Sequence, residues 1–273
     1  MTFSLREISN FFGRPVCLYE FQWGNTFYRY TNADRDIEHA GHSWTATPIS
    51  DNGFTQGGSA DDFVVTMPRS LPIPDLFRLT PPAIKIVLKC WRFHRDDPDD
   101  EAIVYWIGTV GNVKGKDAVT AEVLGLPISK TIRRTGLRLC WEVDCPHALY
   151  GPGCKANRND FRTDTTITAL TGTTITVASL GAWAGERYAG GFIEWEANED
   201  GTIDRRGIES HNGGSIFTLL STTDRLVAGQ EVSLFLGCDL TAETCDDIFN
   251  NLANHGGHKY MAKDSPFDGK QVF

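Results

Sequence analysis

The sequence predicts a mainly β protein, and three observations support that fold class. Short segments rich in Val, Tyr, Phe and Thr recur along the chain between turn residues, which is typical of strands. In the second half these segments follow one another at close, regular intervals, as in sandwiches and barrels. Hydrophobic residues make up 41% of the 273 positions, so the chain has the apolar material for a folded core and is not pervasively disordered.

The first half begins with a predicted short helix over residues 5–12, in which apolar side chains recur at helical spacing. The segments expected to be strands are 16–21, 26–30, 63–67, 83–93, 102–110 and 118–124. Gly24-Asn25 predicts a hairpin between the first two strands. The acidic loop 95–101 predicts a pairing of the fourth strand with the fifth.

An internal boundary is expected near Thr135, which divides the chain into domains 1–134 and 135–273. At this point strand signals give way to a basic stretch, and then to a loop rich in Gly, Pro and Cys over 145–154. The later elements expected are strands at 165–169, 173–177, 191–195, 207–211 and 215–220, and a short helix at 246–251. These strands predict a second β-module, inserted at about 155–237.

Charge and hydropathy argue against two classes of partner. The chain has 26 Lys and Arg against 35 Asp and Glu, a formal net charge of −9, whereas a broad duplex-DNA surface needs clustered cations. No apolar run approaches the roughly 18 residues of a membrane-spanning helix. The first residues lack the basic start and apolar core of a signal peptide, so the protein is expected to be made and folded in a cytosol.

Seven cysteines are present, and five of them lie in two groups in the second half. An odd number of thiols, in a chain that folds in a reducing compartment, argues against a disulfide framework. Cys17 and Cys90 fall inside predicted strands and are expected to pack in the core. For Cys140 we favour packing, and the alternatives are replacing Cys145 as a ligand or shielding a metal centre.

Cys145 and Cys154 enclose eight residues, Cys238 and Cys245 enclose six, and glycine or proline flanks both loops. Four converging thiolates repel one another strongly when buried, and a bound metal removes that cost. Structural zinc prefers paired cysteines with typically two to four residues between them, whereas a cubane iron–sulfur cluster has separated iron corners and accepts wider loops. Spacing alone leaves zinc and iron–sulfur both open, with core packing as the metal-free alternative.

An enzyme is the rival interpretation from a different class. Cysteine peptidases pair a Cys with a His, and both Cys145 with His147 and Cys245 with His255 are near in sequence. Such proximity is common by chance, and Ser210 beside a His lacks a nucleophile elbow. The chain contains neither Gly-x-Gly-x-x-Gly nor a Walker loop. We therefore expect no enzyme, with a zinc-binding structural adaptor and a cell-wall-directed cysteine hydrolase as alternatives.

The motifs around these cysteines can be read together. The run Cys145-Pro-His-Ala-Leu-Tyr-Gly-Pro-Gly-Cys154 is followed by Gly237-Cys238, Cys245, Phe249-Asn250-Asn251 and Gly256-Gly257. This set resembles the phage-encoded family known as DUF2163 or BR0599, and the C-terminal cluster domain of the lambda-type minor tail protein L. The resemblance implies a [4Fe–4S] cluster held by Cys145, Cys154, Cys238 and Cys245. It is the reason to prefer iron–sulfur over zinc.

The resemblance also implies a place in a virion. Members of this family form the hub at the distal end of long non-contractile phage tails and of related gene transfer agents. There they form a trimeric ring between the distal tail protein and the central fibre that contacts the host. By this resemblance, residues 4–127 would form a hub-type β-barrel, and the protein would be a homotrimer in the tail tip, assembled in the host bacterial cytoplasm.

The segment between the two cysteine pairs is longer than in lambda's protein. It places 83 residues between Cys154 and Cys238. A centre that joined the two pairs would close this long segment as a cross-link does, and metal binding would then contribute to folding. We therefore expect the cluster to act as a staple for the C-terminal module.

Overall fold

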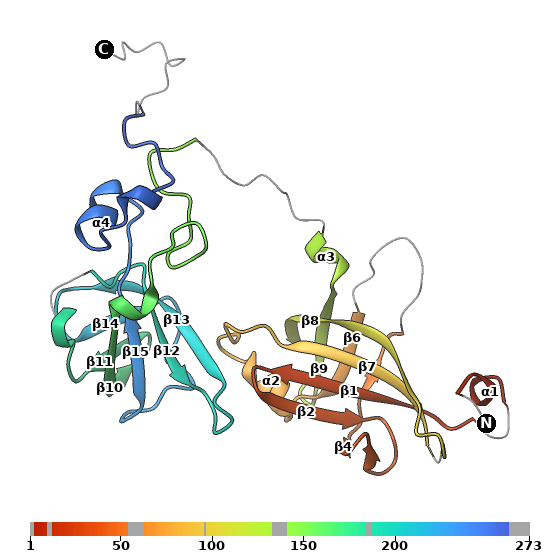
Figure 1. Ribbon diagram of the computed structural model, residues 1–273. Coiled ribbons are helices and arrows are strands. Elements are labelled where there is room, and N and C mark those ends of the chain that lie inside the picture. Colours follow the sequence, from red (N-terminus) through yellow and green to blue (C-terminus); the bar gives the residue numbers. More distant parts are fainter. Residues whose placement is uncertain are drawn as a thin grey trace. The chain divides into compact units, whose positions relative to one another are not determined.

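The computed structural model describes residues 3–9, 13–53, 63–95, 97–132, 141–183 and 187–261, apart from the side chains of residues 131, 132 and 182. Internal contacts divide the chain into two units. Unit 1 comprises Met1–Arg134 with Ala197–Ile203, and unit 2 comprises Thr135–Glu196 with Asp204–Phe273. Both units are built mainly of strands, so the predicted mainly β class is confirmed (Figure 1).

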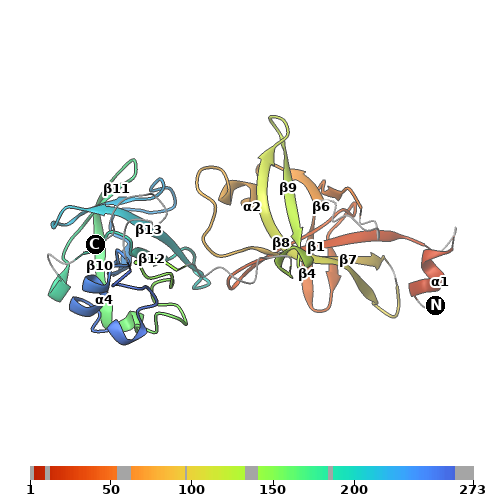
Figure 2. The ribbon, with the colours of Figure 1, turned by 90° about the horizontal axis from the view of Figure 1, so that it is seen from above.

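Unit 1 contains one nine-stranded sheet and short helices. The strands are β1 Pro15–Trp23, β2 Thr26–Thr31, β3 Ile37–His39, β4 His42–Ala46, β5 Ser50–Asp51, β6 Phe63–Pro68, β7 Val87–His94, β8 Ala102–Gly115 and β9 Thr120–Pro127. The helices are α1 Phe3–Glu7, α2 Pro72–Leu76 and α3 Ser129–Ile132. The sheet order is β3-β4-β2-β1-β7-β8-β9-β6-β5, in which β2 and β4 run parallel. Figure 2 shows the long β8–β9 hairpin projecting from this sheet.

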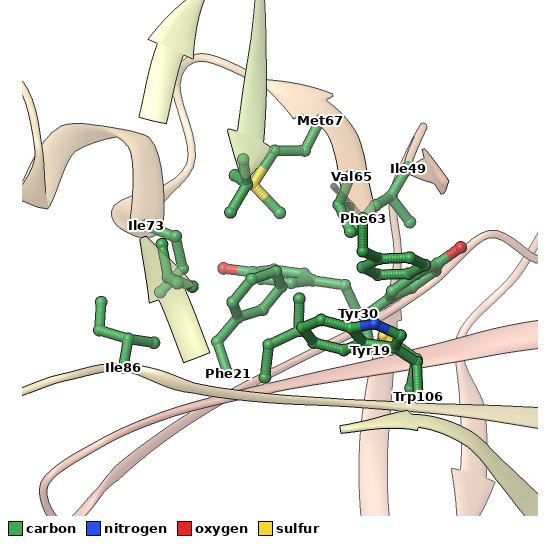
Figure 3. Close-up of a cluster of buried hydrophobic side chains, with 14 of the residues drawn as sticks. Tyr19, Phe21, Tyr30, Ile49, Phe63, Val65, Met67, Ile73, Ile86 and Trp106 are labelled. Atoms are coloured by element: carbon green, nitrogen blue, oxygen red, sulfur yellow. The ribbon is translucent and has the colours of Figure 1, made fainter. Parts of the chain in front are cut away.

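The sheet of unit 1 curls, so that strands distant in its order enclose one core. Asp51 on the edge strand β5 accepts hydrogen bonds from the hydroxyls of Tyr19 on β1, at 2.6 Å, and Tyr105 on β8, at 2.5 Å. Phe63 on β6 stacks on Trp106 of β8, with ring centroids 4.4 Å apart. Figure 3 shows this apolar cluster, and its burial supplies the main driving force for folding unit 1.

Two local features of unit 1 agree with the sequence pattern. Trp23 pairs with Thr26 across the expected hairpin, and Gly24 in its turn has φ +58°, a backbone conformation that favours glycine. The predicted pairing of β7 with β8 is also confirmed. Its register shifts between Cys90 and Trp91, and this irregularity explains why the apolar alternation in β7 is imperfect.

Residues 197–203 belong to unit 1 because they pack on the β1–β2 turn. The hydroxyl of Thr202 donates to the carbonyl of Trp23 at 3.2 Å and accepts from the backbone N–H of Asn25 at 3.1 Å. A Cβ atom on Gly24 would lie 2.6 Å from Cγ2 of Thr202. Both the turn conformation and this close approach therefore require glycine at position 24.

Unit 2 is a closed six-stranded barrel with loops at one end. The strands are β10 Arg162–Thr171, β11 Thr174–Val177, β12 Phe192–Glu196, β13 Ile203–His211, β14 Ile216–Leu219 and β15 Glu231–Phe235. Their order is β10-β11-β14-β13-β12-β15, and β15 closes the barrel by pairing with both β10 and β12. The helices are η1 Arg158–Phe161, η2 Gly181–Trp183, α4 Ala242–Asp247 and η3 Leu252–Asn254.

The structure corrects several expectations drawn from the sequence. The closed barrel lies in unit 2, whereas the barrel expected at residues 4–127 is observed as a curled sheet with β3 and β5 at its edges. The strand pattern missed β3, β4, β5 and β15. The C-terminal helix spans Ala242–Asp247 rather than 246–251, because Thr241 caps its start. Helix α1 ends at Glu7, and residues 10–12 of the longer predicted helix lie outside the described residues.

None of the helices in the described part of the chain has the length and apolar character needed to span a membrane.

Candidate metal centre

Four cysteines of unit 2 meet at one small pocket. Cys145 and Cys154 bound the loop that precedes the barrel, Cys238 follows β15, and Cys245 lies in α4. All four line a single pocket, and none of them forms a disulfide. Cys145 and Cys245 are buried, while Cys154 and Cys238 are partly buried. The structure therefore brings together the four residues singled out in the sequence.

Backbone hydrogen bonds join the two cysteine segments. The N–H of Cys145 donates to the carbonyl of Leu240 at 2.8 Å, and the N–H of His258 donates to the carbonyl of Glu142 at 2.9 Å. Figure 1 shows the loop before the barrel and the segment around α4 at the same end of unit 2. These bonds are made by main-chain groups, so they hold the segments together independently of a bound metal.

The loop from Cys145 to Cys154 folds as consecutive turns. The N–H of Gly151 donates to the carbonyl of Ala148 at 2.9 Å, and Tyr150 has φ +58°. The phenol of Tyr150 donates to the carbonyl of Leu236, at 2.9 Å, just after β15. Aromatic rings from the loop, the barrel and the segment after α4 then pack together around it: Tyr150, Phe161, Phe192, Phe235 and Phe249. This packing fixes the loop against the barrel.

A capped helix positions Cys245. Thr241 is the N-cap residue of α4, and its hydroxyl oxygen accepts from the N–H of Thr244 at 3.2 Å. Asp239 accepts from the N–H and the hydroxyl of Thr241, at 3.1 Å and 2.7 Å. Leu240, between them, has φ +68°. This turn reverses the chain between Cys238 and Cys245, so that both side chains reach the same pocket.

Three of the four sulfur atoms accept hydrogen bonds from N–H groups. The backbone N–H of Leu240 donates to Sγ of Cys238 at 3.3 Å, and that of Gly256 donates to Sγ of Cys145 at 3.4 Å. The side-chain amide of Asn251 donates to Sγ of Cys154 at 3.7 Å. Hydrogen bonds to sulfur stabilise thiolate character and tune metal–sulfur centres. The arrangement suits cysteines that act as thiolate ligands.

The pocket disfavours thiolates that have no metal. Burial, and then the charges of Cys238, Cys145 and Cys154, raise the pKa of the Cys245 thiol to about 11. Burial also raises the pKa of Cys238. A nucleophilic cysteine needs a lowered pKa, so these two thiols are poorly suited to catalysis. A metal centre reverses this balance, because its positive charge deprotonates the thiols that bind it.

The histidines near these cysteines differ in position. His147 lies in the pocket, where a Cβ atom on either Gly153 or Gly256 would be 2.6 Å from its ring. Glycine at both positions therefore leaves the space that the imidazole of His147 occupies. His255 lies instead against the main chain, with Nδ1 accepting from the N–H of Gly257 at 3.2 Å.

The remaining three cysteines, Cys17, Cys90 and Cys140, lie outside this pocket or outside the described residues. Cys90 is fully buried in the core of unit 1, with Cys17 packed against it, as the sequence predicted. Cys140 lies outside the described residues. Sequence reasoning missed the roles of Asn251 and Tyr150, although both lie inside the motifs that the sequence analysis quoted.

Three comparisons relate this chain to known proteins. Residues 186–264, which include Cys238 and Cys245, match the family model described as "Phage conserved hypothetical protein BR0599". An uncharacterized protein of Xylella fastidiosa (strain 9a5c) is 32% identical over 168 residues, or 57% of this chain, and the chain spans 35% of that relative's length. A chain from the structure titled "Virion of native gene transfer agent (GTA) particle" has a TM-score of 0.72 and 16% identity, over 100% of this chain and 99% of that one.

The whole chain has a fold similar to that of a chain in the virion structure, and its 186–264 segment matches the phage family model. The phage-type segment contains one of the two cysteine pairs and Asn251. The other two cysteines that line the pocket, Cys145 and Cys154, lie outside that segment.

Proposed function

We propose that this protein is a structural component of a phage-type virion, a hub at the tail tip, and that a [4Fe–4S] cluster on Cys145, Cys154, Cys238 and Cys245 holds unit 2 together. The observation that carries the proposal is the meeting of these four thiols at one pocket, from segments 83 residues apart, in a chain with a virion-protein fold. The phage-type match over 186–264 supports the same class.

The donor set fits an iron–sulfur cluster. Such clusters are held by four cysteine thiolates, and hydrogen bonds to the sulfurs adjust their potential. The pocket has four cysteines and N–H donors to three of them. When bound, the cluster would supply four metal–sulfur bonds and positive charge. The chain's own part is to bury the ligands and to hold the two segments together.

Geometry also bears on the choice between iron–sulfur and zinc. In the described residues, no group of three or more His, Cys, Asp or Glu side chains is arranged to hold one metal ion, although four cysteines line one pocket. Thiols that bind separate iron corners need only face a common space, whereas zinc needs every sulfur at about 2.3 Å from one point. Four cysteines that line one pocket without being arranged around a single point are compatible with the cluster.

The cluster acts as a staple in this proposal. Joining Cys154 to Cys238 closes a segment of 83 residues that contains the barrel. Closing so long a segment removes freedom from the unfolded chain, and the free energy of metal binding becomes free energy of folding. The proposed role is structural rather than enzymatic.

The tail-tip role specifies partners and assembly. We propose a homotrimeric ring placed between a distal tail protein and a central fibre, in a virion assembled in the host bacterial cytoplasm. The support is the fold likeness to a virion chain along the whole length. Tail particles purified from cells that make a tagged chain should contain it at one end, in a multiple of three copies. A chain that stays monomeric and never joins particles would contradict the hub role.

The composition of the centre is tested directly. Protein purified without oxygen should be brown and contain about four iron and four sulfide per chain. Serine at Cys145, Cys154, Cys238 or Cys245 should remove most of the iron. Cys17→Ser is the matched control and should keep it, because Cys17 packs on the core of unit 1. One zinc and no sulfide would retain the four-cysteine site but reject the cluster. Neither metal, with one fast-reacting thiol, would favour the hydrolase alternative.

A further inference from the structure

Asn251 contacts a cysteine of each pair. The backbone N–H of Asn251 donates to the carbonyl of Cys245 at 3.0 Å. Its side-chain amide donates to the carbonyl of Cys154 at 2.6 Å and also approaches Sγ of Cys154 at 3.7 Å. The two cysteines belong to segments far apart in the sequence, so Asn251 links the two halves of the pocket.

The orientation of this amide is set by a second asparagine. The side-chain N–H of Asn254 donates to Oδ1 of Asn251 at 2.6 Å. With Oδ1 engaged in this way, the NH₂ end of the Asn251 side chain is directed to Cys154. An NH₂ group has two N–H donors, so it can serve the carbonyl and the sulfur of Cys154 together. Aspartate has the same shape but lacks both donors.

The other hydrogen bonds to sulfur come from backbone N–H groups. Cys238 and Cys145 receive theirs from Leu240 and Gly256, and these donors remain whatever side chain is present. Cys154 depends on the side chain of Asn251. Within the described residues, the hydrogen bond to Sγ of Cys154 is therefore the one that a side-chain substitution can remove while the backbone donors stay intact.

We propose that Asn251 is a positioning residue for the metal centre: its amide fixes Cys154 and donates to the sulfur, while its backbone holds Cys245. This inference rests on the proposed function, because it concerns how the chain holds the proposed cluster. Asn251 does not touch the metal in this scheme. It acts through Cys154, by restricting the loop and by stabilising negative charge on sulfur.

The proposal predicts two effects of Asn251→Asp. Loss of the donors should free the Cys154 loop, so the metal should be bound about 10- to 100-fold less tightly, the range found when partners of metal ligands are changed. A chelator should therefore remove it faster. Loss of a hydrogen bond to sulfur, together with a new negative charge, should make the reduction potential of the cluster more negative. A role confined to folding would lower the melting temperature without moving the potential.

The neighbouring asparagine supplies a charge-matched control. Asn250 is exposed, and its φ of +45° is one that aspartate also tolerates. Asn250→Asp therefore adds the same charge one position away, without removing a donor to sulfur. Asn254→Ala is a second test, since it leaves the Asn251 amide in place but releases its orientation. Its effect should lie between those of the wild type and Asn251→Asp.

The measurements are iron and sulfide content, the rate of metal loss to a chelator under argon, and the reduction potential, on the full chain. Faster loss and a lower potential in Asn251→Asp, with Asn250→Asp unchanged, support the proposal. Equal rates and potentials in the wild type and Asn251→Asp overturn it while leaving the cluster intact. If Asn251→Asp fails to fold, Asn254→Ala decides the question by the same readouts. A wild type that holds no metal overturns both this inference and the proposed cluster.

Discussion

The phenol of Tyr150 donates to the carbonyl of Leu236 at 2.9 Å, which joins the first cysteine loop to the chain that leaves the barrel just before Cys238. Tyr150 has φ +58° and lies at the centre of a set of aromatic rings. The hydrogen bond and the ring packing of Tyr150 therefore connect the first cysteine loop to the end of the barrel and to the segment after α4. Burial, together with the charges of Cys154 and Cys238, raises the pKa of Tyr150, so the phenol keeps its proton across the physiological range.

Tyr150→Phe should lower the stability of unit 2 while keeping the packing of the aromatic rings. The ring remains, but the carbonyl of Leu236 loses its partner, so the free energy of unfolding should fall by about 1 kcal/mol. Denaturant unfolding under anaerobic conditions measures this change. Tyr260→Phe is the control, because Tyr260 is 89% exposed and should have no effect. Equal losses for both variants would show that the hydrogen bond contributes nothing.

Substitution of the glycines that contact His147 should destabilise unit 2. A Cβ atom on Gly256 would lie 2.6 Å from Nε2 of His147, so Gly256→Ala should cost about 1–3 kcal/mol and lower the iron content. Gly214→Ala is the control, since a Cβ there meets nothing within 4 Å. Adding His147→Ala to Gly256→Ala should restore part of the lost stability by making room. Failure of that rescue would mean that the clash with His147 is not the cause.

Alkaline pH should destabilise unit 1 through the tyrosines at Asp51. Burial first, and then neighbouring negative groups including Asp51, raises the pKa of Tyr19 and Tyr105 well above the ordinary value. The unfolded chain deprotonates these phenols near pH 10, whereas the folded unit does not. Their contribution to stability is therefore complete below about pH 10 and is lost as pH rises above it.

This prediction is checked by the ultraviolet absorbance of phenolate and by denaturant unfolding between about pH 8 and pH 11. Tyr19 and Tyr105 should ionise only as unit 1 unfolds. In the double variant Tyr19→Phe with Tyr105→Phe, the fall of stability with pH should be shallower. If Tyr19 and Tyr105 ionised near pH 10 in the folded protein, their burial and the nearby charge of Asp51 would not be raising their pKa, which would contradict the prediction.

Removal of the metal should loosen one end of unit 2 and spare unit 1. Without metal, the loop 145–154 and the segment 238–257 lose the proposed bonds to the centre but keep the backbone bond from Cys145 to Leu240. Hydrogen exchange should therefore rise in both segments after chelation, while β1, β7 and β8 stay protected. The Cys238→Ser variant should show the same pattern before chelation. A uniform rise across both units would contradict a local staple.

Much of the fold follows from local patterns. Alternating burial in β6 and the Gly24-Asn25 turn both depend on neighbours within a few residues, and both were predictable. Strands β3 and β5 were missed because they are only 3 and 2 residues long, too short for a pattern, and β4 was missed because only one of its five residues, Trp44, is buried. β15 was also missed, and so was the closure of the barrel, because the pairing of β15 with β10 and β12 joins positions far apart in sequence that no local pattern displays.

By itself, the sequence determined the mainly β class, the first hairpin and the grouping of four cysteines into two short loops. These depend on residue type and on short spacing, which a linear chain displays directly. Only the tertiary structure decided which strand closes the barrel, that the four thiols face one pocket, and that the Asn251 amide reaches Cys154. Those features join positions tens of residues apart, and their geometry exists only once packing has brought the segments together.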